Sequence, residues 1–386
     1  MDVMSWIKLN VDTTHNKIDV IVKFIFSRNI NETFSFGLGN MLEVYDISCN
    51  QFPCTWETKD DLELPFRLGL QQISVDLPME CNVIELRYSG KVNGWSTNIG
   101  PDCVMLNYYS AWYPIFLTKT RIKFNVEIDG LHGFQLVNST YDEDKRVWIY
   151  GTTCFDCNIL ALANGGLTVR TMNDVTIYIH TGPSFDRDNE FEIARIAEEI
   201  IKFFSTSLFQ TKITKTFNLV IGVTSMIEGE TIGYCRNNLI VMGSIEVVNS
   251  EVARLFAHEM AHFWCHGADS STWEDWLNET FAEHSALLFI EDKYGEEAYN
   301  NRIRYHNEEA DAAPAIRTPD GRRPHGVHSK GTVMIQNLRK LYGRDKVFEL
   351  IRIFEVLNPK TTDQFVTEVR NKFGDEISNY IFKHIT

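Results

Sequence analysis

The alternation of apolar and polar positions changes once along the chain, and this change predicts two regions of different structure. Over residues 1–180, apolar positions either alternate with polar ones or form short β-branched runs, which is typical of strands half or fully buried in a sheet. The clearest predicted strands are Ile18–Phe26, Val83–Tyr88, Ile122–Ile128 and Val175–His180. Turn signals such as Asn93-Gly94 and Asn164-Gly165-Gly166 interrupt the pattern. The first region is therefore predicted to be β-rich.

Helical periodicity dominates the rest of the chain. Glu190–Phe209 is predicted to be a long amphipathic helix, because Ile193, Ile196 and Ile200 recur on one helical face. Further helices are expected near 295–309, 330–342, 344–357, 361–372 and 375–384. Two short apolar runs predict strands of a small sheet, Phe217–Val223 and Asn238–Met242.

The turn-forming run Thr181-Gly182-Pro183-Ser184 marks the change between the two regions. With 386 residues, the chain is long enough for two domains that each hold a core. We therefore predict a β-rich domain over residues 1–185 and a mainly helical domain over residues 186–386. The chain contains no apolar run of the roughly 18 residues that a membrane-spanning helix needs, and its first residues lack signal-peptide features.

The strongest chemical signal is the run His258-Glu259-Met260-Ala261-His262. Asn249 favours a helix start before it and Gly267 a helix end after it, so both histidines are predicted to lie in mid-helix. Positions i and i+4 share one helical face, which lets both imidazoles bind one metal ion. Glu259 is then placed to act on a water molecule beside that metal.

A second helical run supplies a third candidate ligand, Glu279, after 16 intervening residues. Two histidines and one glutamate leave a coordination position open for water, which is the catalytic arrangement of zinc. Glu279 also has the alternative role of a solvated helix carboxylate. Glu283, one turn further on, either supports a ligating histidine from behind or is exposed. His266 and His284 compete as ligands because they are close in sequence.

The stretches H-E-M-A-H-F-W and W-E-D-W-L-N-E-T-F-A-E resemble the gluzincin aminopeptidases of the aminopeptidase N type. Two fainter similarities lie at Ala111-Trp112-Tyr113-Pro114 and Ser329-Lys330-Gly331. The resemblance implies a multidomain fold, with a β-rich N-terminal domain (a sandwich or saddle) followed by a mainly α thermolysin-like α+β zinc peptidase domain. From the resemblance, we expect the helical C-terminal domain of the full-length enzymes to be absent. The resemblance also implies that His258, His262 and Glu279 bind one Zn²⁺ per chain.

Three departures from the family pattern concern the substrate. The spacer before Glu279 is 16 residues here and 18 in the family. The stretch Gly233-Tyr234-Cys235-Arg236-Asn237 corresponds to the family's G-x-M-E-N, which binds substrate, so Arg236 replaces the glutamate that holds the free amino group. An arginine pairs with carboxylates and repels an ammonium. In the alternative interpretation, Arg236 is an ordinary surface residue.

The third departure is His328, which stands where the family has the tyrosine that stabilises the oxyanion. A histidine can also donate a hydrogen bond to an oxyanion, so His328 is a candidate catalytic residue. His325 is the competing candidate, and either residue has the alternative role of a simple loop histidine. The loop 310–327 that contains His325 is predicted to border the active site.

Composition and net charge exclude some classes of partner. The net charge of −15 argues against nucleic acid and anionic membranes as partners, and the hydrophobic fraction of 44% indicates a globular chain. Eight scattered cysteines without an export signal predict reduced thiols and a cytoplasmic location. The run Cys154-Phe155-Asp156-Cys157 lacks the second cysteine pair of a structural zinc site and is predicted to be structural.

Together these features predict zinc-dependent hydrolysis of peptide bonds, with specificity that departs from general aminopeptidases. Glu259 is the expected general base and His328 the expected oxyanion donor. The partner is a peptide or protein substrate, and a homo-oligomer is possible. The alternatives are an ordinary aminopeptidase and a non-catalytic peptide-binding or regulatory protein on a peptidase scaffold.

Overall fold

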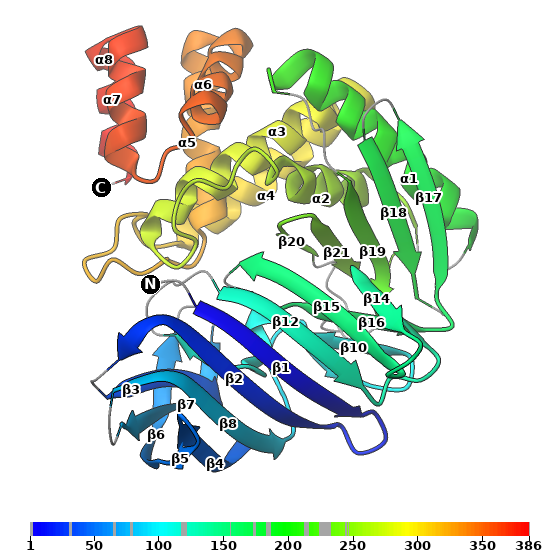
Figure 1. Ribbon diagram of the computed structural model, residues 1–386. Coiled ribbons are helices and arrows are strands. Elements are labelled where there is room, and N and C mark those ends of the chain that lie inside the picture. The colour runs from blue at the N-terminus through cyan, green and yellow to red at the C-terminus, as the bar shows by residue number, and fades with distance from the viewer. Residues whose placement is uncertain are drawn as a thin grey trace. The chain divides into compact units, whose positions relative to one another are not determined.

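The computed structural model forms two compact units (Figure 1). The first unit consists mainly of Met1–Leu167, and the second contains Thr168–Ile179, Phe185–Val220 and Thr231–Thr386. The structure describes residues 3–30, 33–64, 67–77, 80–116, 122–154, 156–172, 175–182, 187–211, 216–223, 233–243, 245 and 247–385. Residues 183–186 of the predicted boundary lie outside the described residues, so the division at residue 185 stays a prediction.

The largest sheet of the first unit has the strand order β14-β15-β12-β1-β2-β8-β4-β5. These strands are β1 Val3–Asp12, β2 Lys17–Ile30, β4 Leu42–Cys49, β5 Phe52–Pro53, β8 Cys81–Gly90, β12 Ile122–Asp129, β14 Ser139–Asp142 and β15 Val147–Cys154. β1 runs parallel to β12 and antiparallel to β2. Along β1 the buried residues alternate with more exposed ones, as a sheet with one covered face requires. The predicted strands Ile18–Phe26, Val83–Tyr88 and Ile122–Ile128 all lie in this sheet.

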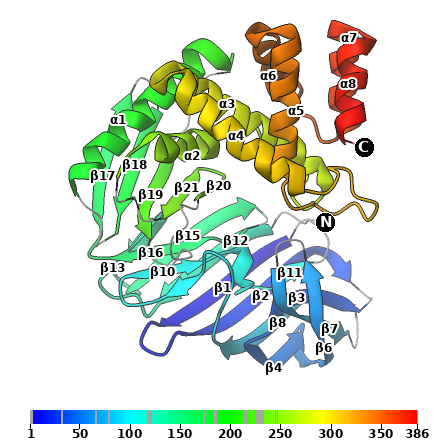
Figure 2. The ribbon, with the colours of Figure 1, turned by 180° about the vertical axis from the view of Figure 1, so that it is seen from behind.

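Two smaller sheets complete the first unit, in the orders β13-β16-β10-β9 and β11-β3-β7-β6 (Figure 2). Their strands are β3 Phe34–Gly39, β6 Thr55–Leu64, β7 Arg67–Asp76, β9 Asn98–Ile99, β10 Cys103–Leu106, β11 Ile115–Phe116, β13 Phe134–Leu136 and β16 Ile159–Ala163. Trp112 follows the short 3₁₀ helix Tyr108–Ser110 and is fully buried. Its indole nitrogen donates to the carbonyl of Cys157 at 2.9 Å, and its own carbonyl accepts from the hydroxyl of Tyr88 at 2.9 Å.

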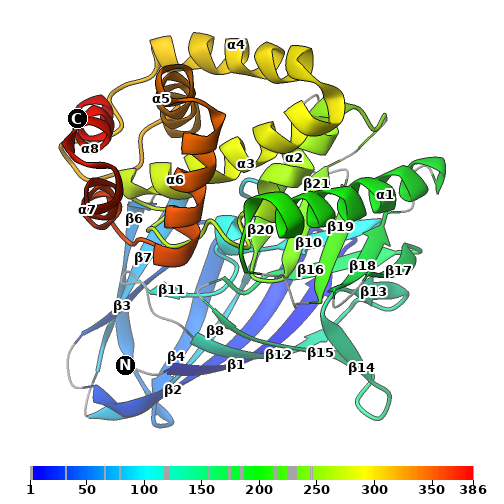
Figure 3. The same cartoon turned by 90° about the horizontal axis from the view of Figure 1, so that it is seen from above.

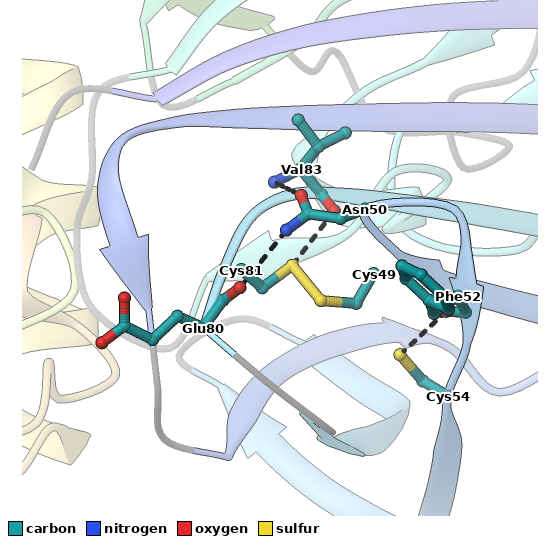
Figure 4. Close-up of a disulfide and its surroundings, with 7 residues drawn as sticks. All are labelled: Cys49, Asn50, Phe52, Cys54, Glu80, Cys81 and Val83. Atoms are coloured by element: carbon teal, nitrogen blue, oxygen red, sulfur yellow. Dashed lines mark hydrogen bonds between the residues drawn. A yellow bond between two sulfur atoms is a disulfide. The ribbon is translucent and has the colours of Figure 1, made fainter.

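A disulfide joins Cys49 at the end of β4 to Cys81 at the start of β8 (Figure 4). Their Cα atoms lie 5.9 Å apart, although 32 positions separate the two residues in sequence. The prediction of reduced thiols is therefore wrong for this pair, because adjacent strands bring together two cysteines that sequence spacing does not connect. Among the described cysteines, Cys54, Cys103, Cys235 and Cys265 are free thiols.

The second unit contains a five-stranded sheet in the order β17-β18-β19-β21-β20, with β20 at one edge. Its strands are β17 Gly166–Met172, β18 Val175–Thr181, β19 Phe217–Val223, β20 Gly233–Arg236 and β21 Leu239–Gly243. The helices are α1 Arg187–Phe203, with a π-helical turn at Phe204–Leu208, α2 Ser250–Ala261, the 3₁₀ helix Trp273–Asp275, α3 Trp276–Tyr294, α4 Glu296–Ala312, α5 Val327–Tyr342, α6 Arg344–Leu357, α7 Thr362–Phe373 and α8 Asp375–Ile385. Each helix and strand predicted in this region has its counterpart here.

Helix α3 lies at the centre of the helical layer and packs on α2, α4 and α5 (Figure 3). From Trp276 to Ile290 nearly all of its side chains are buried, including the polar side chains of Glu283 and His284. Among the described residues, no helix is long and apolar enough to cross a membrane.

Helix α2 ends earlier than the sequence predicts. Asn249 caps its start as expected, by accepting from the backbone N–H groups of Glu251 and Val252. The helix then stops at Ala261, and the next residues make tighter turns, with the N–H of Phe263 donating to the carbonyl of Met260. Gly267 is not the helix end; a Cβ there would collide with Asn358 and Pro359, so its role is close chain packing.

Candidate metal centre

Helices α2 and α3 pack against each other and carry the predicted metal ligands (Figure 2). His258 lies in the last turn of α2, and His262 is the residue that immediately follows this helix. The backbone of His262 is still helical, with φ −61° and ψ −12°, so its ring continues the face on which His258 lies. Glu279 is in the first turn of α3.

The three side chains converge. Within the described residues, His258, His262 and Glu279 form the group whose ligand atoms all lie within 4.8 Å of one another. Nε2 of His258 is 3.2 Å from Oε2 of Glu279, and Nε2 of His262 is 3.6 Å from the same oxygen. The two rings stand nearly perpendicular, at 86°, with centroids 4.9 Å apart.

Hydrogen bonds at Nδ1 orient both imidazoles. Nδ1 of His258 donates to Oε2 of Glu283 at 2.8 Å, and Nδ1 of His262 donates to the carbonyl of Cys265 at 2.9 Å. A carboxylate and a carbonyl accept only, so each Nδ1 carries a proton, and Nε2 is the ring nitrogen left to bind a metal ion. Outer hydrogen bonds of this kind orient histidine ligands in metalloproteins.

Glu283 is buried behind His258, with only 2% of its side chain exposed, so the alternative of an exposed Glu283 is wrong. It also accepts from Nη1 of Arg254 at 2.8 Å and from Nε2 of His306 at 2.8 Å. Burial alone raises the pKa of this carboxyl, but the charge of Arg254 and the hydrogen bond from His258 hold it well below its usual range.

The donor set suits a divalent cation. Oε2 of Glu279 is buried, and among the described residues it accepts no hydrogen bond of good geometry, although imidazole nitrogens surround it. Burial lowers the pKa of His258, but the nearby carboxylates of Glu279 and Glu283 outweigh this effect and raise the pKa to about 10. The cluster therefore favours positive charge at its centre, and two imidazoles with one carboxylate are ligands that zinc accepts.

Glu259 lies next to the metal-ligating group and is nearly buried, at 6% exposure. It packs against the edge strand β20, where a Cβ on Gly233 would lie 3.0 Å from Cγ of Glu259 and 3.2 Å from its Oε1. Only a glycine leaves the carboxylate this room, so Gly233, predicted to bind substrate, is in direct contact with the predicted base.

His328 lies close to the cluster, and His325 does not share this placement. Nε2 of His328 is 2.7 Å from Oε2 of Glu279, and its ring centroid is 5.9 Å from that of His258. Helix α5 begins at Val327 instead of near residue 330, after a left-handed Gly326, and this earlier start puts His328 in its first turn. His325 is exposed in the preceding loop.

The other predicted residues lie further from the cluster. Arg236, at the end of β20, donates to the carbonyl of Cys235 at 2.8 Å and lies 5.6 Å from the ring of Tyr234. Because side chains alternate along a strand, Arg236 and Gly233 lie on opposite faces of β20. Gly233 is on the face that packs against Glu259. His284 donates from Nε2 to the carbonyl of Thr332, and His266 is exposed; neither belongs to the metal-ligating group.

Sequence reasoning missed four residues around the cluster, Arg254, Asp275, His306 and Arg323. Arg254 and His306 are buried partners of Glu283, whereas Arg323 pairs with Asp275 at 2.6 Å and approaches Glu279 at 3.3 Å. The only signal for Arg323 was its place in the loop predicted to border the site. Arg254 stands four residues before His258 on one helical face, which was an available signal.

Comparison with solved structures identifies the architecture. An M1 zinc metallopeptidase from Deinococcus radiodurans superposes with a TM-score of 0.67 at 14% identity, covering 100% of this chain and 94% of that one. The fold is that of an M1 zinc metallopeptidase. Native leukotriene A4 hydrolase from Saccharomyces cerevisiae has a TM-score of 0.70 at 16% identity and covers 98% of this chain and 66% of its own. The predicted fold class is confirmed.

Sequence similarity points the same way. Aminopeptidase N from Lactococcus lactis is 26% identical over 258 residues, which is 59% of this chain. The matched part is 30% of the length of that aminopeptidase. No protein-family model matches the chain. The chain therefore resembles aminopeptidase N in sequence, as the motif around His258 predicts.

Proposed function

We propose that this chain is a zinc metallopeptidase that binds one zinc ion through His258, His262 and Glu279. The observation that carries the proposal is the convergence of these three ligand atoms beside Glu259, with each imidazole turned by its own outer hydrogen bond. The resemblance to aminopeptidase N and the M1 fold support the same chemistry. Zinc bound by these ligands supplies a Lewis acid that polarises the scissile carbonyl and lowers the pKa of water.

Residues of the chain perform the proton transfers. Glu259 accepts a proton from the attacking water and delivers it to the nitrogen of the leaving amine, which breaks the peptide bond. Its packing against Gly233 keeps the carboxylate beside the metal ligands. His328 donates from Nε2 to the oxyanion of the tetrahedral intermediate, the role that the resemblance gives to a tyrosine.

Replacing Glu259 by glutamine tests the proposal. Glutamine has nearly the same volume but cannot take up the proton, so Glu259→Gln is expected to bind zinc as the wild type does and to lose at least ~10²-fold in kcat. Zinc content is measured by elemental analysis, and hydrolysis is followed on a peptide library by mass spectrometry. His262→Ala and Glu279→Ala are the matched variants that lose the metal. A Glu259→Gln enzyme within about threefold of wild type contradicts the mechanism.

We propose further that the specificity departs from that of general aminopeptidases. Arg236 stands where the aminopeptidase N type enzymes that the chain resembles have the glutamate that holds a free amino terminus. A guanidinium repels an ammonium. The spacer before Glu279, two residues shorter than in the family, also shortens the connection between the two helices near the predicted metal ligands. Cleavage inside a peptide, or beside an acidic group, is the expected result. The cytoplasmic location, a peptide or protein substrate and a possible homo-oligomer stay predictions.

A further inference from the structure

Arg323 carries a cluster of polar contacts that the proposed roles leave unexplained. It belongs to the loop between α4 and α5, and only 13% of its side chain is exposed. Nε lies 2.6 Å from Oδ2 of Asp275, and Nη2 lies 3.3 Å from Oε1 of Glu279. The same Nη2 is 3.5 Å from Nδ1 of His328. One guanidinium thus touches a predicted metal ligand and the predicted oxyanion donor.

The backbone around Arg323 holds this side chain in place. The segment 321–323 runs antiparallel to the segment 271–273 that leads into α3, through a bridge between Thr272 and Arg322. Trp273 N–H donates to the carbonyl of Gly321 at 3.3 Å, and Arg323 N–H donates to that of Ser271 at 3.4 Å. The loop is therefore tied to the start of the helix that carries Glu279.

Asp275 anchors the guanidinium from the other side. It is 2% exposed, and its Oδ1 accepts from the amide of Asn278 at 2.8 Å. The amide of Asn278 also pairs with the backbone N–H and carbonyl of Ala268. Asp275 thus belongs to the buried segment between α2 and α3. The rigid, planar guanidinium of Arg323, paired with Asp275, can fix two neighbouring groups at once.

The hydrogen-bonding capacity of arginine determines what it does to its neighbours. A guanidinium only donates, so a nitrogen facing it must offer a lone pair. Nδ1 of His328 is then the acceptor, and the ring proton of neutral His328 is on Nε2. At Glu279 the guanidinium approaches Oε1, which leaves Oε2 to face Nε2 of His258, His262 and, at 2.7 Å, His328.

We infer that Arg323, anchored on Asp275, is a positioning residue that orients Glu279 and holds His328 with its proton on Nε2. This is the form of His328 that can donate to an oxyanion, so the inference rests on the proposed function and deepens it. A purely structural Arg323–Asp275 pair would leave the proton position of His328 unaffected.

The proton position is measured by NMR on zinc-loaded protein with ¹⁵N-labelled histidine, at pH ~8, where an ordinary imidazole is neutral. Signals of His328 are assigned by their loss in His328→Gln. The wild type is expected to show an unprotonated Nδ1 and a protonated Nε2. In Arg323→Gln both nitrogens are expected to move towards the average of the two tautomers. A protonated Nδ1 in the wild type, or an unchanged His328 in Arg323→Gln, would falsify the inference.

Two further variants control the comparison. Arg322→Gln removes the neighbouring arginine, whose side chain is 63% exposed, and is expected to leave the His328 signals unchanged. Arg323→Lys keeps the positive charge beside Asp275 but lacks the planar fork, so it preserves the fold if Arg323→Gln does not. It is expected to lose the fixed tautomer as well. If Arg323→Lys keeps the wild-type tautomer of His328, the planar guanidinium does not have the proposed role.

Kinetics test the link to catalysis. Because the bond from His328 forms in the transition state, Arg323→Gln is expected to lower kcat by about tenfold or more and to change KM by less than about threefold. An unchanged kcat overturns the positioning role even where the tautomer shifts. A wild type that hydrolyses no peptide contradicts the proposed function, while the NMR measurement still decides the role of Arg323.

Discussion

At the scale of single residues, the predicted metal centre depends on a carboxylate, Glu283, that is not itself a predicted ligand. Glu283 holds Nδ1 of His258 at 2.8 Å and is itself held by Arg254 and His306. This arrangement keeps the lone pair of Nε2 directed at the centre of the cluster. The buried guanidinium and the buried carboxylate also neutralise each other, so neither charge is left unpaired inside the fold.

Glu283→Gln tests this support. The amide keeps one acceptor oxygen but loses the charge that pairs with Arg254, and loss of such outer partners typically weakens metal binding by ~10–100-fold. Zinc affinity is measured by competition with a chromophoric chelator. The control is Glu251→Gln, which removes the other carboxylate on Arg254, 55% exposed and 3.2 Å away, and is expected to bind zinc normally. Wild-type zinc affinity in folded Glu283→Gln contradicts the assigned role.

At the scale of elements, the site depends on how closely α3 and α5 cross. Gly331 of α5 lies against Thr280 of α3, the residue after Glu279, and a Cβ on Gly331 would overlap Oγ1 of Thr280. His328 stands one turn before Gly331 on the same helix. This contact between the helices therefore contributes to the spacing between the predicted oxyanion donor and the predicted metal ligand.

Gly331→Ala is expected to force the two helices apart. Overpacking of this kind typically costs ~1–3 kcal/mol in the free energy of unfolding, and the displaced His328 is expected to lower kcat. Denaturant unfolding and peptide hydrolysis measure the two effects. Thr280→Ala removes the colliding oxygen, which has no hydrogen-bond partner among the described residues. The double variant is expected to recover part of both losses, and strict additivity would show that this contact is not the cause.

At the scale of the whole molecule, charge bears on which peptides the proposed enzyme would cleave. Its net charge is −15, and Arg236 would contribute a positive charge to substrate binding. The charge reversal at Arg236 predicts that a free amino terminus is not required. Arg236 lies on the face of β20 opposite Gly233, and Gly233 packs against Glu259.

A panel of matched peptides with free and acetylated amino termini tests the specificity. Wild type is expected to cleave both forms at similar rates, to prefer acidic neighbours of the cleaved bond, and to turn over simple amino-acid arylamides poorly. Arg236→Glu is expected to shift the preference towards free amino termini. Stepwise removal of amino-terminal residues by the wild type, abolished by acetylation, would restore the interpretation as an ordinary aminopeptidase.

Local patterns in the sequence determined the kinds of elements and the chemistry they carry. The i, i+4 spacing of His258 and His262 and the downstream Glu279 led to the cluster that the structure brings together, because helix geometry follows from the backbone alone. Alternation and helical periodicity likewise predicted the β-rich region and the helices after residue 186, since they reflect which face each element buries.

Tertiary structure alone decided which side chains far apart in the sequence become partners. It buried Glu283 behind His258, put His328 and not His325 at Glu279, brought Asp275 and Arg323 together, and joined Cys49 to Cys81. It also ended α2 at Ala261 and packed Gly267, the predicted helix stop, against Asn358. Such pairings depend on chain segments tens of residues apart, and a local pattern carries no information about the distance between them.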